Sequence, residues 1–245
     1  MAVPLILGPK PVIMNQYHYF MKVGIVFMTD LFFDFDGTIA DSEIGIVKSI
    51  KYSVNKMGLP DLSTDQYRKF IGPALITSFR KYYPDLSDGD VTSALRYYQE
   101  YYHKQGIFQL TIYPGILAEL STLNDAGYML HIASAKPEPM INEISEHFGL
   151  GRYFDGEFGA TSDEKTRVTK TAVLKYALEK ANANPQQSVM IGDRDTDMLG
   201  GYNNKVKTLG VTYGFGDVPE LAGAHASEIV DKPEQIQAGV SRLIG

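Results

Sequence analysis

Short apolar runs alternate with amphipathic stretches along the chain from residue 28 onward. An apolar run bounded by turn residues, such as 31–34, is typical of a buried strand. In the stretch 42–57, Ile44, Val47 and Ile50 recur at helical spacing, which predicts an amphipathic helix. Strands that alternate with such helices predict an α/β fold with a parallel sheet and right-handed crossovers. We expect further strands at 128–134, 154–159, 188–191 and 207–211 and further helices at 116–125, 139–148 and 168–181.

A tyrosine-rich section interrupts this alternation at about 62–110. It contains no alternating run of β-branched residues, and Pro84, Gly89 and Gly106 punctuate it, which indicates helices joined by turns. We therefore predict a small all-helical domain at 43–112, inserted into a larger α/β domain. The α/β domain consists of residues 28–42 and 113–245.

Residues 1–27 precede the first predicted strand and its motif. Gly8, Pro9 and Pro11 break their first apolar stretch, and no basic segment precedes it, so the pattern does not indicate a signal peptide. We expect a non-catalytic extension. A translation start assigned too far upstream is the interpretation we favour over a natural extension or a cloning remnant.

Composition and charge exclude several classes of function. The formal net charge is −6, and no run of lysine and arginine forms a basic stripe, so we expect no nucleic-acid partner. The absence of cysteine excludes disulfides, thiolate catalysis and cysteine-bound zinc, and it fits a cytoplasmic location. No segment reaches the roughly 18 uninterrupted apolar residues typical of a membrane-spanning helix, so we expect no membrane partner.

Two carboxylates follow the first predicted strand directly. Asp34 and Asp36 stand one residue apart, and because side chains alternate along a strand they nominally share a face. Two like charges this close repel each other unless a divalent cation or another partner offsets them. The simpler alternative is that both are turn formers, because Asp-Gly is a common turn signal.

Polar residues also follow other predicted strands. Ser134, Ala135 and Lys136 come at the end of one strand, and the segment GDRDTD at 192–197 follows another. Lys170 lies near the start of the helix between them. Because the carboxyl ends of parallel strands meet at one edge of a sheet, we expect these groups to converge there.

This set of residues resembles the haloacid dehalogenase-like hydrolase superfamily, specifically its phosphoglycolate phosphatase-like branch. The resemblance rests on the motif DFDGTIADS at 34–42, on GDRDTD at 192–197 and on GVTYGFGDVPEL at 210–221, and it covers about 29–243. It implies a Rossmann-like parallel sheet with an inserted helical cap, and the predicted insertion at 43–112 matches that cap.

The resemblance implies catalytic and metal-binding roles. Asp34 matches the nucleophile that forms an aspartyl-phosphate, and Asp36 matches the general acid and base. Asp34, the backbone carbonyl of Asp36 and Asp193 match the Mg²⁺ ligands. Asp197 matches a supporting acid near the metal or beside Lys170.

A second group of residues matches the phosphate-binding part of the family. Ser134 and Lys170 match the hydroxyl and the ammonium that hold the phosphate, and backbone N–H groups near Gly37 and Ala135 are further candidate donors. Lys136 competes with Lys170 for this role, and we prefer Lys170 because its position before an amphipathic helix fits the family layout. Lys136 then shapes or lines the cleft.

The resemblance also assigns a cap loop. The segment 70–73 is similar to the family's loop that faces the active site, which makes Gly72 a candidate substrate contact alongside Lys136. A plain turn between two helices is the equal alternative.

The motifs and the resemblance together predict, as the leading hypothesis, a Mg²⁺-dependent phosphatase for a small phosphorylated metabolite. Phosphoglycolate is the substrate that the resemblance suggests first, and nucleoside monophosphates and sugar phosphates follow closely. Within the family, Asp36 favours phosphate ester hydrolysis over dehalogenation. A sugar phosphomutase and a non-catalytic binding protein on the same scaffold remain alternatives. The sequence leaves a monomer and a homodimer equally open.

Overall fold

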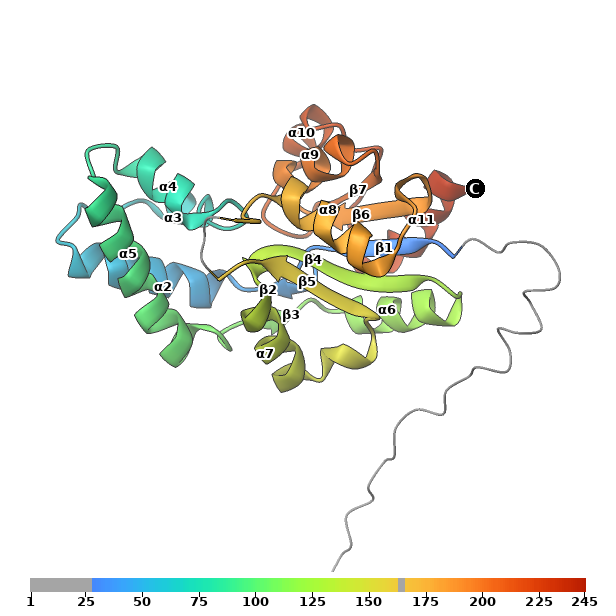
Figure 1. Ribbon diagram of the computed structural model, residues 1–245, viewed down its shortest axis with the longest axis horizontal. Coiled ribbons are helices and arrows are strands. Elements are labelled where there is room, and N and C mark those ends of the chain that lie inside the picture. The colour runs from blue at the N-terminus through green and yellow to red at the C-terminus, as the bar shows by residue number, and fades with distance from the viewer. Residues whose placement is uncertain (1–27, 163–165) are drawn as a thin grey trace, which may run out of the picture.

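The computed structural model describes residues 28–162 and 166–245, so the predicted extension at 1–27 lies outside the described residues. A six-stranded sheet with every neighbouring pair parallel forms its centre (Figure 1). The strand order is β5-β4-β1-β6-β7-β8. The strands are β1 (Asp30–Phe33), β4 (Met129–Pro137), β5 (Gly156–Ala160), β6 (Ser188–Gly192), β7 (Lys207–Val211) and β8 (Glu228–Val230).

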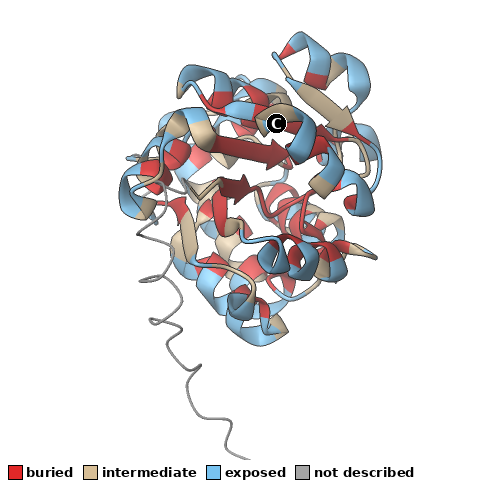
Figure 2. Cartoon of the chain, turned by 90° about the vertical axis from the view of Figure 1, so that its right-hand side faces the viewer, coloured by how far each residue is buried: buried red, intermediate tan, exposed pale blue. Residues whose placement is uncertain are grey.

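The central strands are apolar on both faces because helices cover both sides of the sheet. Leu31, Phe32 and Phe33 of β1 are fully buried, and the central strands stand out as buried in Figure 2. Phe33 belongs to the larger core cluster, whereas Phe32 belongs to a second cluster on the opposite face. The apolar run at β1 is therefore continuous because both faces of this strand are buried.

Helices pack on both faces of the sheet. α8 (Lys170–Ala181) and α9 (Asp195–Asn203) cover one face. The other face carries α6 (Ile116–Asp125), α7 (Glu138–Phe148) and α11 (Ile236–Ile244). α10 (Val218–Gly223) contacts α9 and β8, and short 3₁₀ turns occupy Leu150–Arg152, Pro185–Gln187 and Pro233–Gln235.

The insertion between the first two long strands of the sheet is helical. It contains α2 (Glu43–Lys56), α3 (Thr64–Arg68), α4 (Leu75–Tyr82), α5 (Asp88–Tyr101) and the short π-helix η1 (Tyr102–Gly106). Two short antiparallel strands, β2 (Ala40–Asp41) and β3 (Thr111–Ile112), join it to the rest of the chain. We call α2 through η1 the cap.

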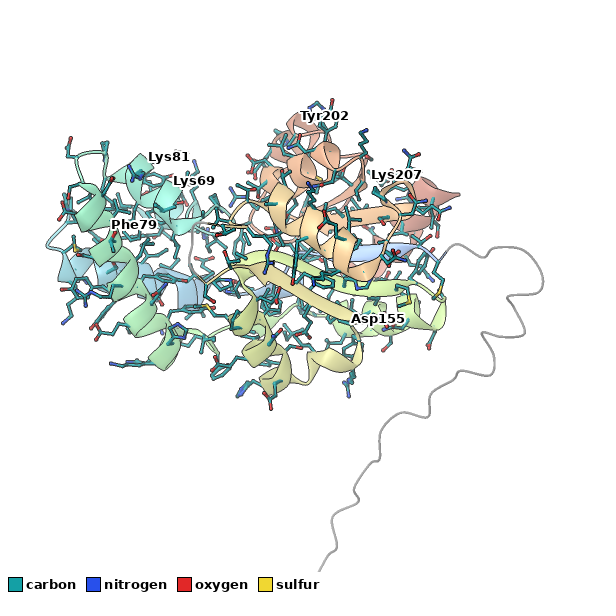
Figure 3. The ribbon with its side chains drawn as sticks, in the orientation of Figure 1. Lys69, Phe79, Lys81, Asp155, Tyr202 and Lys207 are labelled. Atoms are coloured by element: carbon teal, nitrogen blue, oxygen red, sulfur yellow. The ribbon has the colours of Figure 1, made fainter. Side chains whose placement is uncertain are left out.

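Aromatic side chains form the interior of the cap. Phe79, labelled in Figure 3, is fully buried. It meets Phe70 edge to face at 5.4 Å between ring centroids, and Phe70 stacks on Tyr82. Ser63 and Ser87 start α3 and α5 with capping boxes, which satisfy exposed N–H groups of the first turn. The tyrosine-rich pattern thus reflects the packing of a small helical unit.

The predicted fold class is confirmed, and several elements differ from the prediction. Five strands are predicted, but β8 is a sixth, only three residues long. The β2–β3 pair and the helices α9, α10 and α11 are not predicted. α9 has no clear apolar stripe because Gly200 and Gly201 are among its buried residues, so helical periodicity does not show it.

Within the described residues, no helix combines the length and apolar character needed to cross a membrane.

Candidate active site

The sheet order creates a crevice at the carboxyl ends of two neighbouring strands. If the six strands of this sheet are numbered in chain order, their spatial order is 3-2-1-4-5-6. After β1 the chain adds β4 and β5 on one side, and from β6 onward it adds strands on the other side, so the order reverses between β1 and β6. Asp34 directly follows β1, and Asp193 directly follows β6, which pairs with β1. The two carboxylates therefore meet at the point where open α/β sheets bind ligands.

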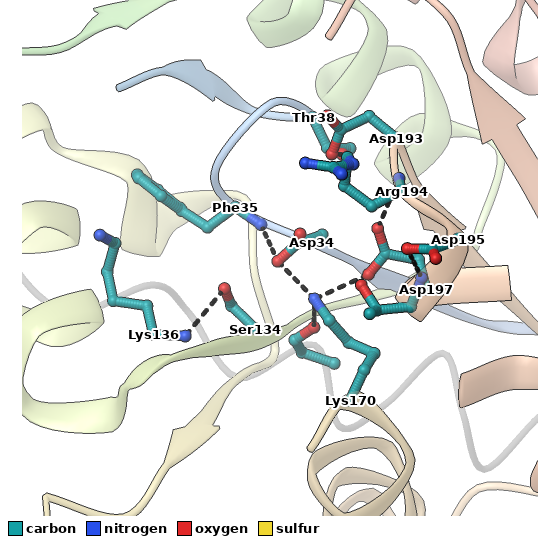
Figure 4. A network of polar contacts seen from close by, with 12 residues as sticks. Asp34, Phe35, Thr38, Ser134, Lys136, Lys170, Asp193, Arg194, Asp195 and Asp197 are labelled. Atoms are coloured by element: carbon teal, nitrogen blue, oxygen red, sulfur yellow. Dashed lines mark hydrogen bonds and ion pairs between the residues drawn. The ribbon is translucent and has the colours of Figure 1, made fainter. Parts of the chain in front are cut away.

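Three buried carboxylates gather at this crevice. Oxygen atoms of Asp34, Asp193 and Asp197 all lie within 4.8 Å of one another. Lys170, the first residue of α8, lies between two of them, with its Nζ 2.6 Å from Asp34 Oδ1 and 2.8 Å from Asp197 Oδ1 (Figure 4). Its ammonium also donates to the carbonyl of Ala133 at 3.2 Å. One cation thus lies among three acids.

The charges of this cluster are unbalanced. Burial opposes the ammonium form of Lys170, but the carboxylates of Asp197 and Asp34 outweigh it and raise the pKa of this lysine. Burial and then the nearby carboxylates of Asp197 and Asp34 raise the pKa of Asp193 well above its usual range. The surplus negative charge is the environment that a small divalent cation with oxygen ligands fits.

Asp193 is held by the turn after β1 and by a late loop. Its Oδ2 accepts a hydrogen bond from the Phe215 N–H at 2.8 Å, and its Oδ1 accepts a long one from Thr38 Oγ1 at 3.4 Å. A Cβ atom at Gly37 would lie 2.1 Å from Asp193 Oδ2, and one at Gly214 would lie 2.5 Å from it. Glycine is required at both positions because the two backbones approach this carboxylate so closely.

The second strand of the site delivers Ser134 and Lys136. The β4–β5 register shifts between Ser134 and Pro137, and Ser134 Oγ accepts a hydrogen bond from the Lys136 N–H at 3.3 Å. Lys136 points away from the Asp34–Lys170 pair (Figure 4). Its Nζ lies 3.1 Å from Asp36 Oδ2 and 2.7 Å from the Tyr102 hydroxyl. The two lysines therefore have different partners.

A cavity between the cap and the sheet opens onto these residues. Core residues Asp34, Asp36, Ser134, Ala135 and Lys136 line it from one side. Cap residues line it from the other side, and they include Ile46, Phe70, Gly72, Leu75, Ile76 and Tyr98. Most of the cap lining is apolar, whereas the polar groups concentrate at the carboxyl ends of β1 and β4.

Arg194 connects the sheet to the cap loop at 70–73. Its Nη1 donates to the carbonyl of Ile71, and its Nε lies 2.7 Å from Glu220 Oε1. Gly72 in this loop has φ +103°, and a Cβ there would lie 3.0 Å from Arg194 Cγ. The sequence analysis gave Arg194 no site role, because a contact across 123 residues leaves no local pattern.

The predicted site residues separate into two groups. Asp34, Lys170, Asp193 and Asp197 form one buried cluster, and Asp34 also lines the cavity with Asp36, Ser134, Ala135, Lys136 and Gly72. The turn near Gly37 is predicted to offer backbone N–H donors, and the N–H of Gly37 is one of them. That N–H donates to the carbonyl of Ala40 at 2.8 Å within the turn. The side chain of Asp36 lies beside Lys136 rather than in the carboxylate cluster.

Comparison with known proteins identifies the family of this chain. Residues 31–211 match the family model of haloacid dehalogenase-like hydrolases. A predicted phosphatase from Clostridium acetobutylicum, whose structure is solved, is 39% identical with a TM-score of 0.83, covering 88% of this chain and 99% of that one. A 5'-nucleotidase from Pseudomonas aeruginosa is 31% identical over 192 residues, which cover 78% of this chain and 86% of that protein.

Two further relatives carry the names of different activities. A phosphoglycolate phosphatase from Psychrobacter arcticus is 28% identical over 209 residues, covering 82% of this chain and 90% of that protein. Tyrosine-protein kinase PtkA from Mycobacterium tuberculosis is 32% identical over 185 residues, covering 75% of this chain and 62% of the kinase. The chain belongs to the haloacid dehalogenase-like hydrolase family, in its phosphoglycolate phosphatase-like branch, and is a phosphoric monoester hydrolase.

Proposed function

We propose that this enzyme is a Mg²⁺-dependent phosphatase that hydrolyses a small phosphorylated metabolite through an aspartyl-phosphate on Asp34. The observation that carries the proposal is the position of Asp34. It lies at the floor of the cavity under the cap, 2.6 Å from the ammonium of Lys170 and within the cluster that contains Asp193. Asp34 is thus the proposed nucleophile, and the same carboxylate contacts a fixed cation and belongs to the candidate metal site.

The buried acids fit a magnesium ion. Asp34 and Asp193 are proposed as its carboxylate ligands, with the backbone carbonyl of Asp36 as a third protein ligand and Asp197 in support. All of these donors are oxygen atoms, which Mg²⁺ prefers, and the raised pKa of Asp193 indicates that the cluster lacks positive charge. When bound, the ion neutralises charge on the phosphoryl oxygens and on the acids around them.

The residues of the chain then divide the reaction into two steps. In the first, a carboxylate oxygen of Asp34 attacks phosphorus, and Asp36 gives a proton to the alcohol oxygen as the bond from that oxygen to phosphorus breaks. In the second, Asp36 takes a proton from a water that attacks the aspartyl-phosphate, which releases phosphate and restores Asp34. Ser134 and Lys170 hold the phosphoryl oxygens in both steps.

The cavity lining favours one substrate class among the candidates. Lys136 is the single lysine or arginine among the described residues that line the cavity, and its ammonium already contacts Asp36 and Tyr102. Among the described lining residues, no second cation is present to pair with the carboxylate of phosphoglycolate. Few polar side chains line the cavity to form hydrogen bonds with the hydroxyls of a sugar. An uncharged, largely apolar or planar leaving group, such as the nucleoside of a nucleotide, suits the lining best.

The deciding experiment measures phosphate release from phosphoglycolate, nucleoside monophosphates and sugar phosphates, with Mg²⁺ and with EDTA. We expect Mg²⁺-dependent release that is highest with nucleoside monophosphates, and loss of turnover in Asp34→Asn while the circular dichroism spectrum stays unchanged. Substantial activity in that variant would contradict the nucleophile. Isomerised sugar phosphate in place of free phosphate would support a phosphomutase instead.

The setting of the enzyme remains a proposal as well. A small phosphorylated metabolite is the proposed partner, and the cytoplasm is the proposed location, because the sequence has no cysteine. Monomer and homodimer remain equal alternatives, and size-exclusion chromatography with light scattering distinguishes them.

A further inference from the structure

Lys136 forms a polar contact between the cap and the catalytic residues that the proposed mechanism does not use. Its side chain is buried, with its ammonium between the carboxylate of Asp36 on the core and the hydroxyl of Tyr102 on the cap. The ammonium is therefore a charged bridge between two parts of the molecule.

This bridge occupies only one side of Asp36. Lys136 Nζ lies 3.1 Å from Oδ2, whereas Oδ1 is buried and has no hydrogen-bond partner among the described residues. A buried carboxylate oxygen without a partner carries a free-energy cost unless a ligand satisfies it. Asp36 also lines the cavity. Lys136 thus holds one oxygen and leaves the other available to a group that enters the cavity.

Tyr102 is the cap residue in this contact, and its position depends on the packing of the cap. It is the first residue of the π-helix η1, and such irregular turns are often found at functional sites. η1 packs closely on α2, since a Cβ at Gly45 would lie 2.2 Å from the carbonyl of Gly106. The ring of Tyr102 stacks on Tyr98 at 5.3 Å between centroids. These contacts fix the hydroxyl relative to the cap helices.

We propose that Lys136 and Tyr102 are positioning residues that make proton transfer by Asp36 depend on the placement of the cap. With the cap in the observed position, Tyr102 holds Lys136, and Lys136 orients Asp36 so that Oδ1 faces the leaving-group oxygen. Without the tyrosine hydroxyl, Lys136 loses a partner and Asp36 loses its fixed orientation. The inference rests on the proposed phosphatase mechanism, in which Asp36 is the acid.

The test compares two substrates of similar size that differ in their need for an acid. The alkoxide released from benzyl phosphate needs a proton as it leaves, whereas 4-nitrophenolate leaves without one. We compare kcat/KM, because it covers the steps up to departure of the alcohol and omits hydrolysis of the aspartyl-phosphate. Asp36→Asn provides the reference for complete loss of the acid.

For Tyr102→Phe we expect kcat/KM to fall about tenfold or more with benzyl phosphate and less than about twofold with 4-nitrophenyl phosphate, since general acid catalysis contributes about 10²–10⁴-fold. Tyr83→Phe is the matched control, because Tyr83 is a buried cap tyrosine whose hydroxyl donates to the carbonyl of Pro60 instead. We expect the control to leave the ratio of the two substrates unchanged.

Substitutions at the lysine complete the test. Lys136→Met should change the substrate ratio in the same direction as Tyr102→Phe, and Lys136→Arg should restore part of it. Equal losses with both substrates in Tyr102→Phe and Lys136→Met would overturn the inference, because a merely structural defect has no preference for the leaving group. That result would leave the phosphatase proposal intact, because the turnover of Asp34→Asn and the release of free phosphate test that proposal separately.

Discussion

Two buried lysines lie in the polar part of the site, and each contacts two side chains that can lose a proton. Lys170 contacts Asp34 and Asp197, whereas Lys136 contacts Asp36 and Tyr102. The first pair of contacts stays within the core, and the second joins the core to the cap. The proposed nucleophile and the proposed acid therefore have separate cations, which allows each to be tested alone.

The ion pairs of Lys170 make a prediction about stability. Lys170→Met leaves Asp34 and Asp197 buried without their cation, and breaking such a pair by removing one partner costs about 3–5 kcal/mol. We expect a loss of that size in the free energy of unfolding, measured by urea denaturation in Mg²⁺-free buffer. Lys175→Met, on an exposed position of the same helix, should change it by less than about 0.5 kcal/mol.

A double variant separates the charge effect from lost packing. Asp197→Asn removes one of the two carboxylates that Lys170→Met leaves unpaired. We expect the double variant to be less destabilised than the sum of the two single variants, by about 0.5–3 kcal/mol, which is the usual range for residues in one network. Simple additivity would show that the stability loss in Lys170→Met comes from packing alone.

At the scale of elements, the loop at 70–73 sets how the cap meets the sheet. Gly72 and Gly58 are both cap residues with positive φ, at +103° and +64°. A Cβ at Gly72 would lie 3.0 Å from Arg194 Cγ, whereas one at Gly58 would meet no atom of the described residues within 4 Å. Gly72 also lines the cavity. The two glycines thus share a backbone requirement and differ in their surroundings.

This difference predicts different effects on activity. Both Gly72→Ala and Gly58→Ala should lower the free energy of unfolding by about 1 kcal/mol, because alanine disfavours positive φ. Only Gly72→Ala should displace Arg194 and its bond to Ile71, and we expect kcat/KM to fall roughly tenfold, since small misplacements near a site are costly. Steady-state kinetics and thermal denaturation of both variants measure this. An equal loss of activity in both would contradict a specific role for the contact with Arg194.

The same elements show what the sequence predicts and what it does not. Local patterns predict that Asp34 follows β1 and that Lys170 lies at the start of α8. Such positions are predictable because the end of a strand and the start of a helix depend on residues that are neighbours in the sequence. The bonds from Lys136 to Tyr102 and from Arg194 to Ile71 join residues 34 and 123 positions apart. No periodicity encodes such pairs, since they depend on how the cap lies over the sheet.

At the scale of the whole molecule, the sheet brings acids from distant segments into one buried cluster with too little positive charge. Asp34 and Asp193 follow two central strands, and among the described residues Lys170 pairs directly with Asp34 and with Asp197. The raised pKa of Asp193 means that the folded protein without metal keeps a proton on this cluster to a higher pH than the unfolded chain does. Folding stability and metal binding are linked through that proton.

The linkage gives the direction of a pH effect. Burial and the neighbouring carboxylates raise the pKa of Asp193 above its ordinary value of 3.8, so the folded apoprotein binds more protons than the unfolded chain. The contribution of Asp193 to folding stability therefore falls as pH rises from about 3.8 through the raised value, by the linkage of proton binding to folding. Mg²⁺ binds the deprotonated acids and has to displace this proton. The stabilisation by Mg²⁺ should therefore grow with pH over the same window and then level off.

Thermal denaturation with Mg²⁺ and with EDTA at about pH 5 and pH 8 tests this prediction. At a Mg²⁺ concentration 100 times Kd, binding to the folded state alone adds about 2.7 kcal/mol. For a chain of 245 residues that corresponds to a Tm increase of roughly 5–10 °C at the higher pH. Asp193→Asn should remove both the Mg²⁺ shift and its pH dependence, because it deletes a proposed ligand and the group that titrates. A shift of equal size at both pH values, or one that persists in Asp193→Asn, would show that Mg²⁺ binds elsewhere.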